Sequence, residues 1–343
     1  MKVGAEANNM HMALLENFTS YYCSNCPTGH NRLSAAYQGL EDRVAWVSHH
    51  AGFQNDAMTI SESLQLEALY GTSSTYAPAM MIDRDMIYSE GNPGPVHQLE
   101  SSSTIHYQLS QTTSTPCPLR LNLRGINYDA SSRQLQVTVD GRFLSDMQAD
   151  NPRLALYLCE DSVIGFQANG YSNNNNYCHD HVIRASITNV WGDPDIVTST
   201  TEGSTFAHTF TYTLPQGLRA DKCYLVAFVA NYGSSVTTGR KVLNTIKSGY
   251  ITSDPGSPLS ISVHQMVEAR LFPIPASNVV YISANETIHG ITVSNMQGGR
   301  VMECGHFNAD MVELDVSPLA SGIYLLKVET SSGKTTRKMV VSR

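Results

Sequence analysis

The stretch Met12-Ala13-Leu14-Leu15-Glu16-Asn17-Phe18-Thr19-Ser20-Tyr21-Tyr22-Cys23-Ser24-Asn25-Cys26-Pro27 carries most of the information about the fold. Its first seven residues, apolar except for Glu16 and Asn17, are typical of a buried strand, and a Cys-x-x-Cys pair follows closely. The next apolar residues recur at the spacing of one helix face: Leu33, Ala36, Tyr37 and Leu40. The sequence therefore predicts a strand, a cysteine pair and a helix, with Cys23 at or just before the helix N-terminus.

This position favours redox chemistry at the cysteine pair. A helix N-terminus offers unpaired N–H groups and a partial positive charge, which stabilise a thiolate relative to a thiol. Cys23 is therefore the predicted nucleophile, and Cys26 is the thiol that attacks the resulting mixed disulfide. A structural disulfide and a metal site are the alternatives. Zinc needs about four ligands, however, and the sequence contains no second Cys-x-x-Cys and no His-x₃₋₅-His.

The following segments continue an alternation of strands and helices. Strands are predicted at 44–48, 79–83 and 86–88, and helices at 64–70 and 95–110. Together with the cysteine pair, this order resembles the thioredoxin family over roughly the first 110 residues. The family has a cis-proline opening the third of these strands, and Pro78 matches it. The resemblance implies that Ala77 and Pro78 contact the substrate backbone.

The sequence departs from the thioredoxin pattern around the cysteine pair and at the buried acid. Tyr22 stands where a Trp usually precedes the first Cys, and Ser24-Asn25 replaces Gly-Pro. The buried acid that assists proton transfer in the family corresponds to Asn17, and Glu16 falls on the opposite strand face. The acid of the usual proton relay is therefore absent from its expected position.

Other polar residues have weaker functional signals. His49-His50 and His179-Asp180-His181 are candidate metal ligands, but neither group is a full coordination set, and such histidines are more often satisfied polar groups at strand ends. No Ser-His-Asp spacing, P-loop or Gly-rich nucleotide loop is present, so we expect no metal and no cofactor. Cys159 and Cys178 flank an Asn-rich segment and are either a loop-closing disulfide or two thiols.

Composition limits the class of protein. The chain has 343 residues, which favours two or three domains, and its net charge of −8 without a Lys or Arg block argues against nucleic acid as a partner. No run of 18 apolar residues is present, so no membrane-spanning helix is expected. Residues 1–6 lack an apolar signal core, which predicts either an internal protein or a removed signal. Seven cysteines favour an oxidising compartment and hence export.

Breaker-rich segments near 112–116 and 253–258 predict domain boundaries. We therefore expect a multidomain chain: an α/β thioredoxin-like domain (1–115), a central β-sandwich (116–257) and a small immunoglobulin-like β-sandwich (264–343). Strands of the central domain are predicted at 119–123, 135–139, 154–158, 206–212 and 224–229. With Glu16-Asn17-Phe18-Thr19 and 179–185, this arrangement resembles the outer-membrane-protein-28 family, which implies a surface or envelope setting.

The last 80 residues resemble the type IX secretion C-terminal sorting domain in ordered blocks. The blocks are 271–277, 291–295, 298–301, 319–328 and 338–341. The resemblance implies passage through the periplasm, interaction with the type IX secretion machinery, and a final location at the outer-membrane surface or outside the cell.

Two functions from different classes are compatible with these patterns. One is a thiol–disulfide oxidoreductase for protein or peptide disulfides, with Cys23 and Cys26 reacting and Ala77 and Pro78 holding the substrate. The other is a surface binding protein or adhesin in which the thioredoxin-like domain is a scaffold and the cysteine pair only a staple.

Overall fold

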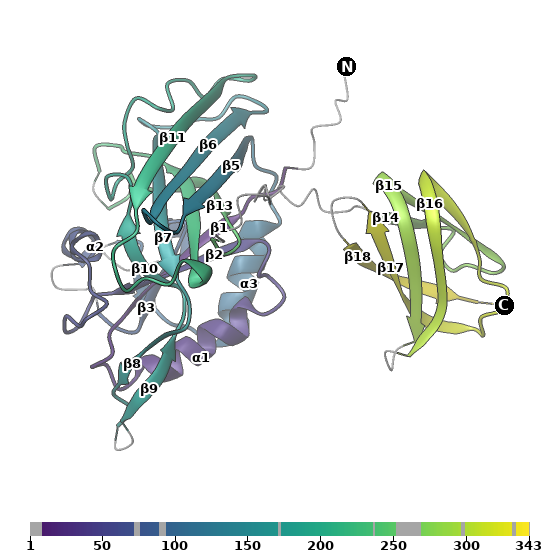
Figure 1. The fold of residues 1–343 in the computed structure, drawn as a ribbon, viewed down its shortest axis with the longest axis horizontal. Helices are drawn as coiled ribbons and strands as arrows, with labels where there is room; N and C mark the ends of the chain where they lie inside the picture. The colour runs from purple at the N-terminus through teal and green to yellow at the C-terminus, as the bar shows by residue number, and fades with distance from the viewer. Residues whose placement is uncertain are drawn as a thin grey trace. The chain divides into compact units, whose positions relative to one another are not determined.

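The computed structural model describes residues 9–71, 76–88, 94–170, 173–235, 237–251, 269–295, 299–330 and 334–342. The chain divides into two compact units, Met1–Ser260 and Ile261–Arg343 (Figure 1). Within the described residues, no helix is both long enough and apolar enough to cross a membrane.

An eight-stranded mixed sheet is the centre of the first unit. Its strand order is β13-β12-β7-β10-β2-β1-β3-β4, and β2 pairs in parallel with both β1 and β10. The bounds are β1 Ala13–Thr19, β2 Val44–His50, β3 Ala79–Ile82, β4 His97–Gln98, β7 Arg153–Glu160, β10 Val182–Ser186, β12 Cys223–Ala230 and β13 Val242–Lys247. The sheet is thus assembled from segments that lie far apart in the sequence.

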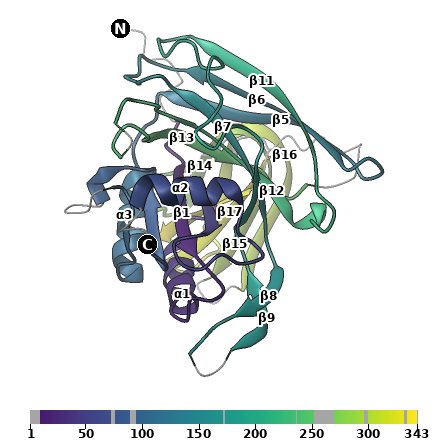
Figure 2. The same ribbon diagram turned by 90° about the vertical axis from the view of Figure 1, so that its left-hand side faces the viewer.

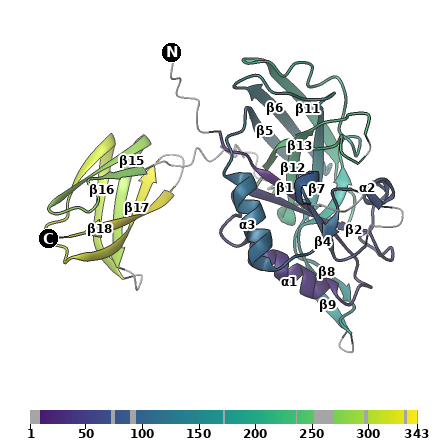
Figure 3. The ribbon, with the colours of Figure 1, turned by 180° about the vertical axis from the view of Figure 1, so that it is seen from behind.

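Helices cover both faces of this sheet. Helices α1 (Cys26–Tyr37) and α3 (Ser102–Thr113) pack side by side on one face, where Leu33, Ile105 and Leu109 meet Leu15 and other strand residues (Figure 3). Helix α2 (Ser61–Gly71) packs on the other face, against Phe18 and Met81. Successive residues of a strand point to opposite faces of the sheet. The adjacent β1 residues Glu16 and Asn17 therefore point to opposite faces.

A separate three-stranded sheet, β11-β6-β5, packs against β13 (Figure 2). It consists of β5 (Leu119–Asp129), β6 (Gln134–Phe143) and β11 (Thr205–Thr213), and its alternating burial is that of a sheet with one covered face. A short 3₁₀ helix, Ala220–Lys222, precedes β12. A two-stranded hairpin, β8 (Val163–Gln167) and β9 (Asn174–His179), lies beside α1.

The domain boundary expected near residue 115 differs from what the structure shows. Strands β7, β10, β12 and β13 of the expected central sandwich join the sheet of the expected thioredoxin-like domain, so residues 1–260 form one compact unit. The physical reason is burial on both faces: all eight residues of β12 are buried, and such strands need a layer on each side. The five strands predicted in this region are all present, as β5, β6, β7, β11 and β12.

Two local predictions in the first unit are wrong. Met86–Tyr88 is a 3₁₀ turn, and the fourth strand is His97–Gln98. The third helix begins at Ser102 because the hydroxyl of Ser101 accepts a hydrogen bond from the backbone N–H of Thr104 (3.2 Å) and caps it.

The second unit is an antiparallel β-structure. Its strands are β14 (Ala269–Phe272), β15 (Val279–Asn295), β16 (Arg300–Asp315), β17 (Gly322–Thr330) and β18 (Lys334–Val341). Alternating residues such as Val280, Ile282, Leu326 and Val328 form its core. The expected boundary at 253–258 and Gly298 lie outside the described residues.

Candidate functional site

Cys23 and Cys26 form a disulfide at the start of α1. Cys26 is the first helical residue, and Cys23 lies in the preceding turn, where its carbonyl accepts a hydrogen bond from the Cys26 N–H (3.2 Å). The predicted place of Cys23 just before the helix is therefore confirmed. Pro27 suits the first turn because that turn leaves backbone N–H groups without helical partners.

The Ala77–Pro78 peptide bond is cis and lies against the disulfide. The Cys23 Sγ is 3.5 Å from the carbonyl oxygen of Ala77. On the other side of Pro78, helix α1 approaches so closely that a Cβ on Gly29 would lie 2.7 Å from the Pro78 Cβ. The structure thus brings together all four residues that the sequence singled out.

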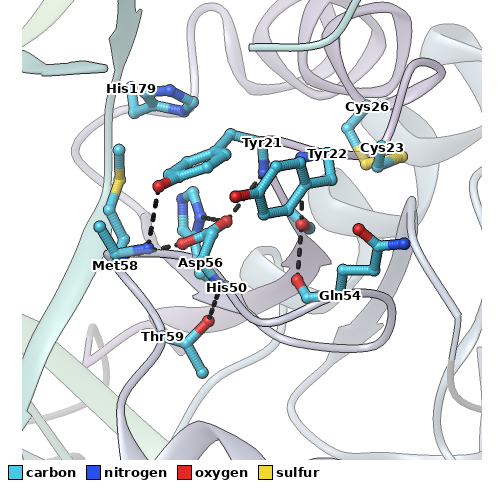
Figure 4. A network of polar contacts seen from close by, with 12 residues as sticks. Tyr21, Tyr22, Cys23, Cys26, His50, Gln54, Asp56, Met58, Thr59 and His179 are labelled. Atoms are coloured by element: carbon cyan, nitrogen blue, oxygen red, sulfur yellow. Dashed lines mark hydrogen bonds and ion pairs between the residues drawn. A yellow bond between two sulfur atoms is a disulfide. The ribbon is translucent and has the colours of Figure 1, made fainter. Parts of the chain in front are cut away.

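The side chain of Asp56 holds the loop before the disulfide through hydrogen bonds. Its Oδ2 accepts hydrogen bonds from the Tyr21 N–H (2.8 Å) and from the His50 ring (2.7 Å), and its Oδ1 accepts one from the Met58 N–H (2.8 Å). Figure 4 shows these contacts near the disulfide, with the Tyr22 ring beside the ring of Tyr21. The loop conformation is therefore held by side chains that follow β2.

The β8–β9 hairpin covers the disulfide region. The side-chain amide of Gln167 donates to the carbonyl of Cys23 (2.9 Å), and the Ala168 N–H donates to the carbonyl of Tyr21 (2.7 Å). The Phe166 ring packs against Tyr21 and Tyr22, at centroid distances of 5.8 and 6.0 Å. Cys23 is consequently only 5% exposed and Cys26 3%. The sequence did not predict that the hairpin covers the disulfide. The residues around Gln167 give no signal of a contact with Cys23, which lies 144 positions away.

The adjacent residues Glu16 and Asn17 contact different partners on opposite faces of the sheet. Asn17, at the position of the family's acid, accepts hydrogen bonds from the indole N–H of Trp46 (2.6 Å) and from the Ser48 hydroxyl (2.8 Å). Glu16 points to the other face, as predicted, and forms a two-pronged pair with Arg84 (2.8 Å for each contact). Burial alone would raise the pKa of Glu16, but the Arg84 charge and hydrogen bonds more than offset it, so the pKa falls to about 2.

Each candidate metal-ligating histidine has a local partner. The His49 ring contacts Glu16 (3.1 Å) and Ser63 (3.0 Å), and His179 contacts the Phe166 carbonyl (3.1 Å). His181 contacts the hydroxyl of Tyr224 (3.0 Å) and stacks on Trp46. In the described ranges, no cluster of three or more His, Cys, Asp or Glu side chains is arranged to hold a metal ion.

The other five cysteines are free thiols. Cys117, Cys159 and Cys223 are buried, Cys304 is half-buried and Cys178 is exposed on the hairpin. Cys159 and Cys178 are therefore not bridged here, and burial raises the pKa of the Cys223 thiol to about 12. The Cys23–Cys26 pair is the disulfide of the described chain.

Comparisons with known proteins give two family matches. Residues 65–248, more than half of the chain, match outer membrane protein Omp28, and residues 270–342 match the secretion system C-terminal sorting domain. No curated protein matches the chain. The sorting domain implies interaction with the type IX secretion machinery, and the two matches indicate a secreted protein of the outer-membrane surface.

Among solved structures, HBP35 of Porphyromonas gingivalis is similar over 98% of this chain and 100% of its own, with a TM-score of 0.59 and 17% identity. A protein from Agrobacterium tumefaciens is similar over 73% of this chain and 98% of its own, with a TM-score of 0.44 and 11% identity. A domain of the outer membrane lipoprotein Omp28 from Porphyromonas gingivalis covers 39% of this chain and 89% of its own, with a TM-score of 0.26 and 18% identity. At these identities, the first similarity supports the fold alone.

Proposed function

The chain belongs to the outer membrane protein Omp28 family, and from that premise we propose that its first unit is a thiol–disulfide oxidoreductase working outside the cytoplasm. One observation carries the proposal: the Cys23–Cys26 disulfide lies at the start of α1, with the Cys23 Sγ 3.5 Å from the carbonyl of Ala77 in the cis Ala77–Pro78 bond. A staple at a random surface site requires neither the helix start nor the cis-proline. The position of the pair at the helix start and its contact with Ala77 support the proposed redox site.

In the proposed reaction, the Cys23 thiolate attacks one sulfur of a substrate disulfide. A Cys23–substrate disulfide forms, and the first substrate sulfur leaves as a thiolate. Cys26 then loses its proton and attacks the Cys23 sulfur, which releases the second substrate thiolate and restores the Cys23–Cys26 bond. Two electrons pass from the cysteine pair to the substrate, and the reverse sequence oxidises a substrate dithiol.

Protein or peptide disulfides are the proposed substrates. Ala77 and Pro78 are proposed to pair with an extended substrate backbone beside Cys23, as the thioredoxin resemblance implies. Ala77 is half-buried and the side chain of Tyr22, the residue before Cys23, is exposed, which supports access of a substrate to this part of the loop.

The proposed architecture follows from the same resemblance. Residues 1–115 are proposed to be a thioredoxin-like core that residues 116–257 extend within one compact unit. Residues 264–343 are proposed to be an immunoglobulin-like sandwich that serves as the sorting domain, consistent with the antiparallel strands of the second unit.

A scaffold function is the second candidate, and the burial of the pair favours it. Cys23 and Cys26 are 5% and 3% exposed beneath the hairpin, and Asn17 stands where a proton-accepting acid is expected. In this case the first unit is a surface binding protein and the disulfide only holds the loop to α1.

A redox titration separates the two candidates. The full chain is equilibrated in glutathione buffers, alkylated and analysed by mass spectrometry, with Cys178→Ser as the background because Cys178 is exposed. We expect a midpoint between about −270 and −120 mV, the range of oxidoreductases. A pair that stays oxidised below about −300 mV would mark a structural disulfide and reject the redox function.

A further inference from the structure

A small polar cavity lies directly behind Cys26. Its volume is about 20 Å³, enough for one water molecule. Its lining includes Asn17, Cys26, His30, His50, His179 and Asp180. Side chains from β1, β2, α1 and the β8–β9 hairpin therefore line the cavity together with Cys26.

The proposed reaction requires a proton acceptor in this cavity. Cys26 is only 3% exposed, so its sulfur contacts little bulk solvent, and the nearest candidate acceptors are groups that line the cavity. The Asn17 amide is not a base, and its oxygen is already occupied by Trp46 and Ser48. A different group has to take the Cys26 proton before Cys26 can attack.

His30 is placed for this task by the geometry of α1. It follows Cys26 by four residues, so the two side chains lie on one face of the helix, and both line the cavity. On its other side, the His30 ring packs on Trp46, with the ring centroids 5.1 Å apart. No hydrogen bond among the described residues involves the His30 ring nitrogens, so they remain available for the thiol or for a single bridging water.

The groups that face His30 come from three other elements. Asp180 follows β9, His179 ends β9 and His181 precedes β10, while His50 from β2 shares the cavity wall. Burial lowers the pKa of His30, and the Asp180 charge counteracts this in part. Burial also lowers the pKa of His179 to about 4, and His50 adds to the effect. His30 is thus neutral at neutral pH, and Asp180 can stabilise the imidazolium that proton transfer creates.

We propose that His30 accepts the proton of Cys26 when Cys26 attacks the Cys23–substrate disulfide, and that Asp180 stabilises the charged ring. The inference rests on the proposed oxidoreductase function. The proton passes from Cys26 Sγ to a His30 ring nitrogen, the Cys26 thiolate bonds to the Cys23 sulfur, and the substrate leaves as a thiolate. The imidazolium then returns its proton to the leaving thiolate or to solvent, so the histidine is regenerated.

The test follows the two chemical steps separately. The reduced full chain, in a Cys178→Ser, Cys304→Ser background, is mixed with 5,5′-dithiobis(2-nitrobenzoate). Attack by Cys23 releases one coloured thiolate, and resolution by Cys26 releases the second. In His30→Gln we expect the first phase to be unchanged and the second to slow about 100-fold at pH 7. We also expect the slow phase to gain a dependence of about tenfold per pH unit, because hydroxide then replaces the imidazole.

His106→Gln is the matched control. His106 lies at the α1–α3 contact and hydrogen-bonds the carbonyl of Ala36 (2.8 Å), outside the cavity, so both phases should keep their wild-type rates. A second phase in His30→Gln that is as fast as in the wild type, with the same pH profile, would overturn the role of His30 alone. A wild-type chain without any second phase would overturn the oxidoreductase function and this inference together.

A measurement without a variant covers the case in which His30→Gln does not fold. The ring proton signals of His30 are titrated by NMR in the oxidised and the reduced wild-type chain. We expect the apparent pKa of His30 to lie below 6.5 in the oxidised chain and to shift on reduction, because Cys26 then becomes a titrating neighbour. Identical titrations in both redox states would overturn the proposal.

Discussion

The Cys23 sulfur lies 3.5 Å from the carbonyl oxygen of Ala77, a residue 54 positions further along the chain. This contact joins the turn before α1 to the cis bond before β3. It places the sulfur of the proposed nucleophile beside a backbone carbonyl at the position where the thioredoxin resemblance puts the substrate.

Single serine substitutions should give different products at the two cysteines. With Cys23→Ser, turnover of a peptide disulfide should be lost, because the attacking sulfur is absent, while far-UV circular dichroism stays unchanged. With Cys26→Ser, the Cys23–substrate disulfide should accumulate, and intact-mass measurement should detect it. Cys178→Ser is the control and should behave as the wild type. Equal turnover in Cys23→Ser would reject Cys23 as the nucleophile.

Removing the Gln167 amide should open the site. Gln167→Ala loses the 2.9 Å hydrogen bond to the Cys23 carbonyl and the side chain that fills the space beneath the hairpin. We expect dithiothreitol to reduce the disulfide several-fold faster, as measured by quenched alkylation. Gln134→Ala, at an exposed strand position, is the control. An unchanged reduction rate would mean that the hairpin does not limit access to Cys23.

Gly29→Ala should destabilise the protein, although alanine normally favours a helix by up to about 1 kcal/mol. The added Cβ would lie 2.7 Å from the Pro78 Cβ, so α1 or the cis-proline loop has to move. We expect a loss of about 1–3 kcal/mol in the free energy of unfolding, measured by urea denaturation. Gly249→Ala, which adds a Cβ in open space, should be nearly neutral. A stabilised Gly29→Ala would show that the close approach is not constraining.

The buried Glu16–Arg84 pair should be the main cause of the fall in the free energy of unfolding at acid pH. The pKa of Glu16 is about 2 in the folded chain, against an ordinary value of 4.5, so its contribution is complete above pH 4.5 and is lost as the pH falls towards 2. Glu16→Gln should cost about 3–5 kcal/mol at pH 7, because it leaves Arg84 buried without its charge partner. Glu16→Gln should also make the free energy of unfolding less dependent on pH between 4.5 and 2, as measured by urea denaturation at each pH.

The exposed pair of Arg124 and Asp140 provides the comparison for Glu16. The Arg124 side chain is 67% exposed, so Arg124→Met should change the free energy of unfolding by less than about 1 kcal/mol. If Glu16→Gln were as mild as Arg124→Met, the buried pair would not be a principal stabilising contact of the first unit.

Deleting residues 264–343 should separate folding from export. The first unit has its own compact core, so the shortened chain should remain folded, with unchanged thermal unfolding of that unit. It should accumulate before the cell surface, because the sorting domain is missing. Cell fractionation and surface proteolysis provide the measurement. Normal surface display of the shortened chain would reject the sorting role.

The sequence predicted the local features of the site well, for physical reasons. The strand, cysteine pair and helix lie within 30 residues, and their signals are periodicity and spacing, which need no distant partner. The opposite orientation of Glu16 and Asn17 follows from the two-residue period of a strand. His30 is four residues after Cys26 and could have been found from helix spacing alone.

The sequence did not predict how the strands combine. Leu154–Leu158 and Tyr224–Val229 are uninterrupted apolar runs, which indicate strands buried on both faces and therefore a central place in a covered sheet. The alternating strands at 119–123 and 135–139 indicate a sheet with one covered face, and they do form the separate three-stranded sheet. The sequence did not predict that the hairpin covers the disulfide, because the burial of Gln167 depends on the Cys23 loop, which is far away in the sequence.

The single eight-stranded sheet has a consequence for the order in which the exported chain can fold. The edge of β2 is closed by β10, where Val182 pairs with Ser48, so this edge cannot be paired before the chain beyond residue 182 is available. Pairing between segments so far apart in the sequence slows folding. A chain that emerges from a translocation channel with its N-terminus first would therefore expose its cysteine pair to the oxidising compartment before the β8–β9 hairpin closes over it.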